Sequence, residues 1–262
     1  MKISVAMITF NEEKILRKTL ESVKNLVDEI VIVDSGSTDD TENIAKEFGA
    51  RFYKESWKGY GPQRNSAIEK CEGTWILNID ADEEISEELK NKILDITSDK
   101  KNKKEIYKIN RLSVCFGKKI KHGGWGTSYA IRLFKKGAGI FNDNVVHESF
   151  ETDKEIYKIK ENIYHHSYLT MEDYFNRFNR YTTEGAKDYY NKGKKVGIFD
   201  ITLNPIYKFL KMYIFRLGFL DGVEGFVIAS TSSLYSMIKY FKLREMYKNG
   251  SYIQKNNNSK NG

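Results

Sequence analysis

Two patterns of apolar residues alternate along the N-terminal part of the chain, one typical of buried strands and one typical of helices. Short apolar runs predict buried strands, and each is followed by a stretch in which apolar residues recur every three or four positions, as on one face of a helix. We expect strands at 2–9, 29–34, 51–54 and 75–79 and helices at 12–27, 41–48 and 63–71, with Asn11 as the first N-cap. Strands that alternate with helices in this way predict a mostly parallel sheet flanked by helices, an α/β fold.

The pattern changes after residue 98, where the charged run 99–104 predicts a solvated loop. Strands are expected at 106–115, 129–134 and 156–159, and Thr170 with Asp173 predicts the N-terminal cap of a helix over 171–190. Asn204-Pro205 is expected to open a further segment, and a helix-like run leads to Tyr247. This predicts an α/β domain over 1–168, a C-terminal helical extension over 169–247 and a disordered tail over 248–262.

Composition supports a folded chain with a large core, because 40% of the 262 residues are hydrophobic. Cys71 and Cys115 stand alone, so neither a disulfide framework nor a zinc site is expected, and a reducing, cytoplasmic setting follows. No signal peptide is apparent, and no uncharged run is long enough for a membrane span.

The net charge of +7 is unevenly distributed. Residues 1–153 carry 25 Lys and Arg against 26 Asp and Glu, whereas residues 154–262 carry 18 against 10. The basic C-terminal part predicts an anionic partner, and with no nucleic-acid-binding motif that partner is a membrane surface or an acidic substrate. Lys208, Lys211 and Arg216 lie among large apolar residues, which fits an interfacial helix or a core-packing helix with a solvated edge.

Asp80 and Asp82 directly follow the predicted strand that ends at Ile79. Strand side chains alternate between faces, so the two carboxylates should share a face, where they repel each other unless a cation lies between them. Oxygen ligands of this kind suit Mg²⁺ or Mn²⁺, which also take substrate phosphates. The alternative is an acidic surface turn over 80–84, with Ser86 capping the next helix.

Polar residues also follow other predicted strands: Thr9 and Asn11 the first, Asp34 and Ser35 the second. Ligands of open α/β sheets bind at the carboxyl ends of strands, so these groups should converge, although Asp34 alone could be a loop-capping residue. A glycine-rich turn over 59–61 leads into a helix whose first turn holds Arg64, which would face a phosphate or solvent. Neither the loop after Asp34 nor the glycine-rich turn 59–61 is a Walker or dinucleotide-binding motif.

Four segments together, 9–13, 33–39, 63–65 and 80–82, resemble the family 2 glycosyltransferases of GT-A fold. Segments 132–134, 146–148, 165–168 and 218–222 resemble, more narrowly, the lipopolysaccharide core β-1,4-glucosyltransferase group. The resemblance implies a nucleotide-sugar site with a divalent cation, Mg²⁺ or Mn²⁺. Its nucleotide-sugar ligands would be Thr9, Asn11, Glu12, Asp34, Ser35, Arg64 and Asp80, and its metal ligands Asp80 and Asp82, with His147 as a further candidate.

The resemblance also implies inverting transfer by direct displacement, for which one base suffices. Glu148 is the expected base, with Asp143 in reserve. The expected reaction moves a hexose, glucose in the narrowest form, from a UDP-sugar to a lipid-linked saccharide of the lipopolysaccharide inner core. The expected location is cytoplasmic and peripheral on the inner face of the membrane. Many relatives have an aspartate where Ser35 stands, so uracil recognition would rest on a neutral hydrogen bond.

Several alternatives stay open from the sequence. The acceptor could be a capsule precursor, a polyprenyl-linked precursor or a protein, and a non-catalytic sugar-nucleotide-binding or membrane adaptor protein is the rival from another class. His147 could be a loop residue bonded to the backbone, and that role is favoured for His165 and His166. Trp125 could stack on an acceptor sugar or anchor a hairpin.

Overall fold

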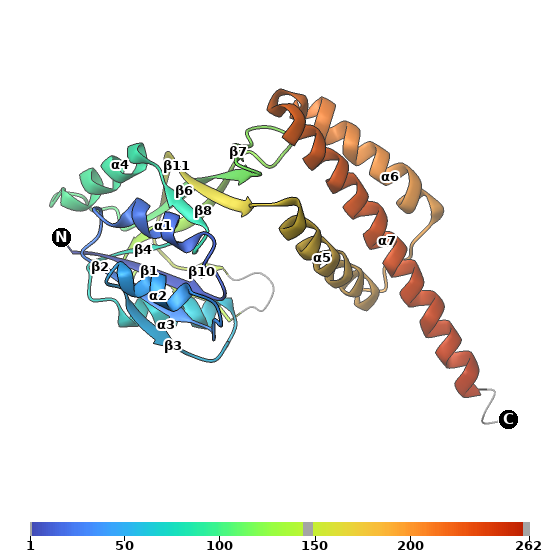
Figure 1. Ribbon diagram of the computed structural model, residues 1–262, viewed down its shortest axis with the longest axis horizontal. Helices are drawn as coiled ribbons and strands as arrows, with labels where there is room; N and C mark the ends of the chain where they lie inside the picture. The colour runs from blue at the N-terminus through green and yellow to red at the C-terminus, as the bar shows by residue number, and fades with distance from the viewer. Residues whose placement is uncertain (1, 144–148, 259–262) are drawn as a thin grey trace. The chain divides into compact units, whose positions relative to one another are not determined.

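The computed structural model describes residues 2–143 and 149–258 (Figure 1). The chain divides into two compact units, one formed by 1–112 with 127–167 and the other by 113–126 with 168–262. The predicted boundary lies after residue 168 and places 113–126 in the α/β domain. In the structure that segment belongs to the second unit.

The first unit is built on a mixed sheet. Its strands are ordered β3-β2-β1-β4-β8-β6-β11-β5, with β1 parallel to β2 and β4, and β2 parallel to β3. From β4 onward the described ladders are antiparallel. The bounds are β1 Ile3–Thr9, β2 Glu29–Asp34, β3 Arg51–Lys54, β4 Trp75–Asn78, β5 Glu83–Ile85, β6 Ile106–Cys115, β8 Ser128–Lys135 and β11 Ile156–Tyr168.

Helices cover both faces of the parallel part, because its strands are apolar on both sides. Val5 and Met7 of β1 pack with α1 (Leu16–Val23) and α4 (Glu87–Ser98), whereas Ala6 between them packs with α3 (Tyr60–Lys70). The remaining helix of this unit is α2, Thr41–Glu47. This mixed sheet, whose parallel part is flanked by helices, is the predicted α/β, GT-A-like fold.

The N-terminal boundary of α1 differs from the prediction. Asn11 does not cap the helix, because its side-chain oxygen accepts a hydrogen bond from the Thr38 amide, at 2.8 Å, rather than from an amide of the helix. The helix starts at Leu16 instead. The caps expected at Ser86 and Thr170 are confirmed, since their hydroxyls accept hydrogen bonds from the amides of Leu89 and Asp173.

Strand β11 is longer than the predicted 156–159, because Ile163 to His165 pair with β5, a strand that the sequence does not predict. Two short strands, β9 (Ile140–Phe141) and β10 (Phe150–Glu151), form a separate antiparallel pair. Phe141 and Phe150 pack edge to face across this pair, with ring centroids 5.1 Å apart. The pair therefore brings two aromatic rings together beside α3.

The second unit is mostly helical, which confirms the predicted C-terminal extension. It comprises α5 (Met171–Asn191), α6 (Ile198–Leu210), the π-helical turn Lys211–Phe215, the 3₁₀ turn Gly218–Asp221 and α7 (Gly222–Asn258). Helices α6 and α7 lie side by side (Figure 1). The expected break at Pro205 is wrong, since this residue lies inside α6. Packing compensates there, because Pro205 is buried and its carbonyl accepts a hydrogen bond from Ser233 at 2.7 Å.

A buried aspartate joins the segment 121–126 to the 3₁₀ turn within the second unit. The Asp221 carboxylate accepts hydrogen bonds from the amides of Lys121 and His122 and lies 3.0 Å from His122 Nδ1. Trp125 packs against Tyr168, with ring centroids 6.0 Å apart. These contacts favour the interpretation of Trp125 as an anchor of this segment.

The C-terminal helix also bears on two expectations. Helix α7 extends to Asn258, so the expected tail falls partly on this helix and partly on residues 259–262, outside the described residues. In the described part of the chain, no helix combines the length and apolarity that a membrane crossing requires.

Candidate functional site

The first part of the site is the loop that follows β2. The parallel register of β1 and β2 pairs Thr9 with Asp34, and the Thr9 hydroxyl donates to the buried Asp34 carboxylate at 2.8 Å. The amides of Gly36 and Ser37 donate to the other carboxylate oxygen at 2.9 and 2.7 Å. Asp34 therefore fixes the conformation of the loop from inside.

Asn11, Glu12 and Ser35 lie at the same edge of the sheet. The Asn11 amide donates to the Ser37 hydroxyl at 2.7 Å, and the Glu12 amide donates to the Thr41 hydroxyl at 2.8 Å. The Ser35 hydroxyl oxygen is buried and makes no hydrogen bond to any described residue. A buried polar atom without a partner is uncommon in native structures, so Ser35 is well suited to bind a ligand.

Helix α1 holds the acidic triplet in place. The Thr19 hydroxyl donates to the Ala81 carbonyl at 2.7 Å, and the Ser22 hydroxyl accepts from the Ile85 amide at 3.0 Å. Strand β4 ends at Asn78, and the residues that follow form a turn. The expectation that Asp80 and Asp82 share a strand face is therefore wrong, and each carboxylate has different partners.

Asp80 lies between two arginines. Its Oδ1 is 2.6 Å from Arg64 Nη2 and its Oδ2 is 2.5 Å from Arg132 Nη2. Burial alone would raise the pKa of Asp80, but the charges of Arg132 and Arg64 hold it well below its ordinary value. Arg64, expected to face a phosphate or solvent, is buried and also donates to Asn78 Oδ1 at 3.1 Å.

Glu83 extends this network of ion pairs through Arg132 to Arg111. It is fully buried, and its Oε1 accepts from Arg132 at 2.8 Å and lies 3.4 Å from Arg111 Nε. Burial would lower the pKa of Arg132, but the charges of Asp80 and Glu83 outweigh it and raise that pKa. Sequence reasoning did not predict these roles for Glu83, Arg111 and Arg132, although Arg132 stands in one of the quoted motifs.

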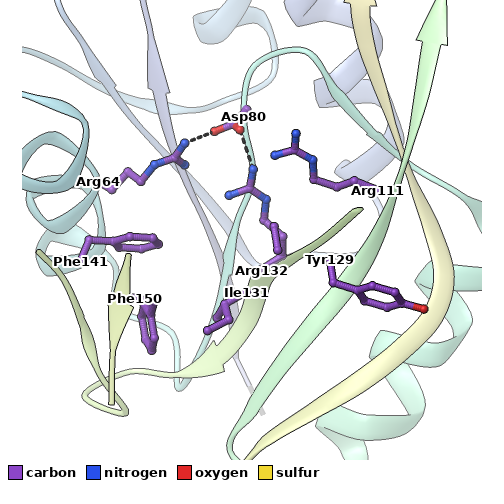
Figure 2. A pocket seen from close by; sticks show the side chains of 9 residues that line it. Arg64, Asp80, Arg111, Tyr129, Ile131, Arg132, Phe141 and Phe150 are labelled. Carbon is purple, nitrogen blue, oxygen red and sulfur yellow. Dashed lines mark hydrogen bonds and ion pairs between the residues drawn. The ribbon is translucent and has the colours of Figure 1, made fainter. Parts of the chain in front are cut away.

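A cavity of about 340 Å³ opens beside the three arginines. Figure 2 shows Arg64, Arg132 and Arg111 around Asp80, with the rings of Phe141 and Phe150 on one side and Tyr129 on the other. Among the described residues, three guanidinium groups contact two carboxylates here, Asp80 and Glu83, so the cationic groups outnumber the carboxylates that they contact. The cavity is thus suited to an anionic ligand.

Asp82 faces strand β11 rather than Asp80. Its Oδ2 lies 3.3 Å from His165 Nε2, and the Nδ1 of the same ring lies 2.9 Å from the Ser167 hydroxyl. Burial would lower the pKa of His165, but the hydrogen bond and charge of Asp82 raise it. The neighbouring His166 pairs with Glu84 at 2.8 Å. Both histidines lie on a strand and face carboxylates, so the expectation of loop histidines bonded to the backbone is wrong.

The pair Asp82 and His165 fits a divalent cation better than the pair Asp80 and Asp82 does. A carboxylate oxygen and an imidazole nitrogen face each other, and the second ring nitrogen is held by a hydroxyl, as in many metal-ligating histidines. Among the described residues no group of three such ligands could hold a metal. Two protein ligands completed by substrate phosphates is a common arrangement for Mg²⁺.

Of the two candidate bases, only Asp143 lies within the described residues. Glu148 and His147 are outside the described residues. Asp143 is described and exposed, two residues after Phe141 at the cavity wall.

Comparison with known proteins finds a matching family model and several relatives. The model of glycosyl transferase family 2 matches residues 4–145. An uncharacterized glycosyltransferase of Rickettsia typhi is 35% identical over 94% of this chain and 87% of that protein. The lipopolysaccharide core biosynthesis glycosyltransferase LpsC of Rhizobium meliloti is 28% identical over 94% of this chain and 93% of its own length.

Solved structures give weaker matches. TarS of S. aureus, residues 1–349, covers 95% of this chain and 92% of that chain, with 16% identity and a TM-score of 0.44. Glucosyl-3-phosphoglycerate synthase from Mycobacterium tuberculosis, solved with Mg²⁺ and UDP, covers 42% of this chain and 43% of that chain, with 25% identity and a TM-score of 0.37.

Proposed function

The chain belongs to glycosyl transferase family 2, and from this premise we propose that it transfers a hexose, glucose in the narrowest form, from a UDP-sugar to a lipid-linked saccharide of the lipopolysaccharide inner core. The observation that carries the donor part is the convergence of the Asp34 loop, the arginine pair on Asp80 and the pair Asp82–His165 at one edge of the sheet. The likeness to LpsC over nearly the whole chain supports the acceptor class.

Each group at this edge has a role in donor binding. The Ser35 hydroxyl, which lacks a partner among the described residues, hydrogen-bonds the uracil or ribose, and the loop held by Asp34 positions it. Asp82 and His165 would hold Mg²⁺ or Mn²⁺, with Asp80 placing Arg64 beside the diphosphate. The cation supplies charge stabilisation for the departing diphosphate.

Transfer then needs only one proton acceptor. We assign this role to Glu148, with Asp143 in reserve, because a carboxylate can take the proton of the acceptor hydroxyl as it attacks the anomeric carbon. No covalent sugar–enzyme intermediate is formed in this scheme, and the anomeric configuration inverts.

A lipid-linked acceptor requires access to a membrane, and the second unit carries a suitable surface. Large apolar side chains along α6, the turns after it and the start of α7 are unusually exposed, Phe199 at 68%, Phe215 at 74% and Val223 at 74%. We define the apolar surface by these residues together with Leu203, Phe219 and Leu220, each of which is at least 45% exposed. Large exposed apolar side chains gathered in one region of the chain are a mark of protein or membrane contact.

The basic residues of this region have other contacts. Lys208 is half-buried over the Tyr235 ring, and burial lowers the pKa of its ammonium group. The Arg216 guanidinium packs against Gly124, where an added Cβ would come within 2.2 Å of Nη1. Lys211 is likewise half-buried, with its Nζ 5.7 Å from the centroid of the Tyr207 ring. We therefore assign the main membrane contact to the apolar surface, which would attach by insertion.

The donor proposal is tested by thermal shift with UDP-glucose, with and without Mn²⁺. Binding to the folded state alone raises stability as ligand concentration exceeds Kd. We expect a Mn²⁺-dependent shift in the parent that is lost in Asp82→Ala and kept in Asp153→Ala, a change at an exposed site away from the cavity. No shift with any UDP-sugar would contradict the proposal. Metal-dependent hydrolysis of the UDP-sugar separates an enzyme from a non-catalytic adaptor.

The membrane proposal is tested by co-sedimentation with anionic vesicles at low and high salt. The double change Phe215→Ser and Val223→Ser should reduce binding at both salt concentrations, because insertion is not screened by ions. Leu94→Ser, at an exposed apolar residue of α4, is the matched control and should bind like the parent. Binding that disappears at high salt and is unaffected by the double change would show Coulombic adsorption instead.

A further inference from the structure

Arg111 differs from its two arginine neighbours in how its guanidinium is used. Arg64 and Arg132 each contact Asp80, and Arg132 also donates to Glu83. Among the described residues, the shortest approach of Arg111 to a carboxylate is 3.4 Å, between its Nε and Glu83 Oε1. That nitrogen is buried and makes no hydrogen bond to a described residue.

The environment of Arg111 leaves its charge available to a ligand. Glu83, its nearest carboxylate, is already neutralised by Arg132 at 2.8 Å. The Arg111 side chain is 26% exposed and lines the cavity (Figure 2). A guanidinium in this position presents donors in a planar fork that matches phosphate or carboxylate oxygens.

The order of strands in the sheet shows which part of the substrate would meet Arg111. The nucleoside loop follows β1 and β2, the acidic triplet follows β4, and Arg111 lies on β6, beyond β8. A UDP-sugar bound with its uracil at Ser35 and its diphosphate beside Asp82 would extend along the edge of the sheet from β2 toward β8 and β6. The acceptor must approach the donor sugar from the side that the nucleotide does not occupy, which is the side of β8 and β6.

We propose that Arg111 is the centre of an acceptor subsite that binds an anionic group, a phosphate or a carboxylate, on the acceptor saccharide. This inference rests on the proposed function and adds that the enzyme selects an acidic acceptor. Tyr129 of β8 and the ring of Phe150 form apolar walls of the same cavity. They suit the carbon face of a sugar ring.

The test uses the full chain saturated with UDP and Mn²⁺, so that the donor phosphate positions are filled, and inorganic phosphate as the probe. Phosphate should raise the melting temperature of the UDP-bound parent. Arg111→Gln should weaken phosphate binding about tenfold or more, because a charge-assisted pair is lost. Arg111→Lys should retain part of the binding. Lys108→Gln removes the same charge from the same strand but outside the cavity lining, so it should bind phosphate like the parent.

UDP affinity, measured on the same variants, shows whether inorganic phosphate binds at Arg111 or at the position of the donor diphosphate. The proposal predicts that Arg111→Gln binds UDP within about twofold of the parent. It is overturned if phosphate competes with UDP, if Arg111→Gln weakens UDP and phosphate equally, or if the UDP-bound parent binds no phosphate. A parent that fails to bind UDP would instead refute the proposed function, and phosphate titration of the protein alone would still report on Arg111.

Discussion

Removing Arg132 should destabilise the first unit strongly, because this arginine lies between two carboxylates, the fully buried Glu83 and the partly buried Asp80. The Arg132 side chain is 5% exposed and contacts Asp80 at 2.5 Å and Glu83 at 2.8 Å, and Glu83 is fully buried. Loss of one partner from a buried ion pair costs about 3–5 kcal/mol. Arg64 still contacts Asp80 and Arg111 still approaches Glu83, so we expect Arg132→Met to cost about 3 kcal/mol, the lower end of that range.

Urea unfolding followed by tryptophan fluorescence measures this change. A Trp125→Phe background confines the signal to the first unit, where Trp75 is buried. The double variant Arg132→Met with Glu83→Gln should recover at least about 1 kcal/mol, because it removes the unpaired carboxylate. Lys2→Met, which breaks an exposed ion pair with Glu72, should have little effect. A double variant no more stable than the single one would refute the reasoning.

The same variant has a predictable pH dependence. Arg132 holds the pKa of Asp80 below its ordinary value, so the stability from this pair is present above the pKa of an unfolded aspartate and is lost as the pH falls toward the folded pKa. The difference in unfolding free energy between the parent and Arg132→Met should therefore be largest near neutral pH and shrink below about pH 4. A difference that grows in acid would contradict the assigned cause.

Three further predictions concern the reaction. Asp80→Ala and Asp82→Ala should each abolish transfer, and thermal melts should show that both variants fold; parental activity in either would remove it from the site. His165→Ala should raise the Mn²⁺ concentration needed for half-maximal activity, about 10-fold or more, whereas unchanged Mn²⁺ dependence would exclude it as a ligand. Glu148→Gln should lower turnover with donor affinity unchanged, and if Asp143→Asn shows that behaviour instead, the base is Asp143.

The parallel part of the sheet could be predicted because its strands are buried on both faces and read as continuous apolar runs. Strand β5 could not, since Glu83-Glu84-Ile85 carries two acidic residues and resembles a polar turn. It becomes a strand because Ile163 pairs with Ile85 and Arg132 neutralises Glu83. Both conditions depend on residues far along the chain, which no local pattern contains.

The residues of the candidate site also divide into those that local sequence predicts and those that it does not. Thr9, Asp34 and the acidic triplet could be placed together because parallel strands deliver their carboxyl ends to one edge. Arg111 and Arg132 come from antiparallel strands, whose register local sequence does not specify. A shift in the pairing of β6 with β8 between Tyr107 and Lys108 adds to this, because it changes which residues of the two strands are opposite each other.

Asp80 and Asp82 have different consequences for the reaction although they are two residues apart. If the strand continued through both, their carboxylates would share a face and compete for one cation. The chain leaves the strand after Asn78, so Asp80 meets Arg64 and Arg132 while Asp82 meets His165. One carboxylate thus organises the cationic side of the cavity, and the other remains available to a metal with an imidazole beside it. In the proposed site, this separation lets one acidic turn serve both a cation, through Asp82, and the arginines that bind anions, through Asp80.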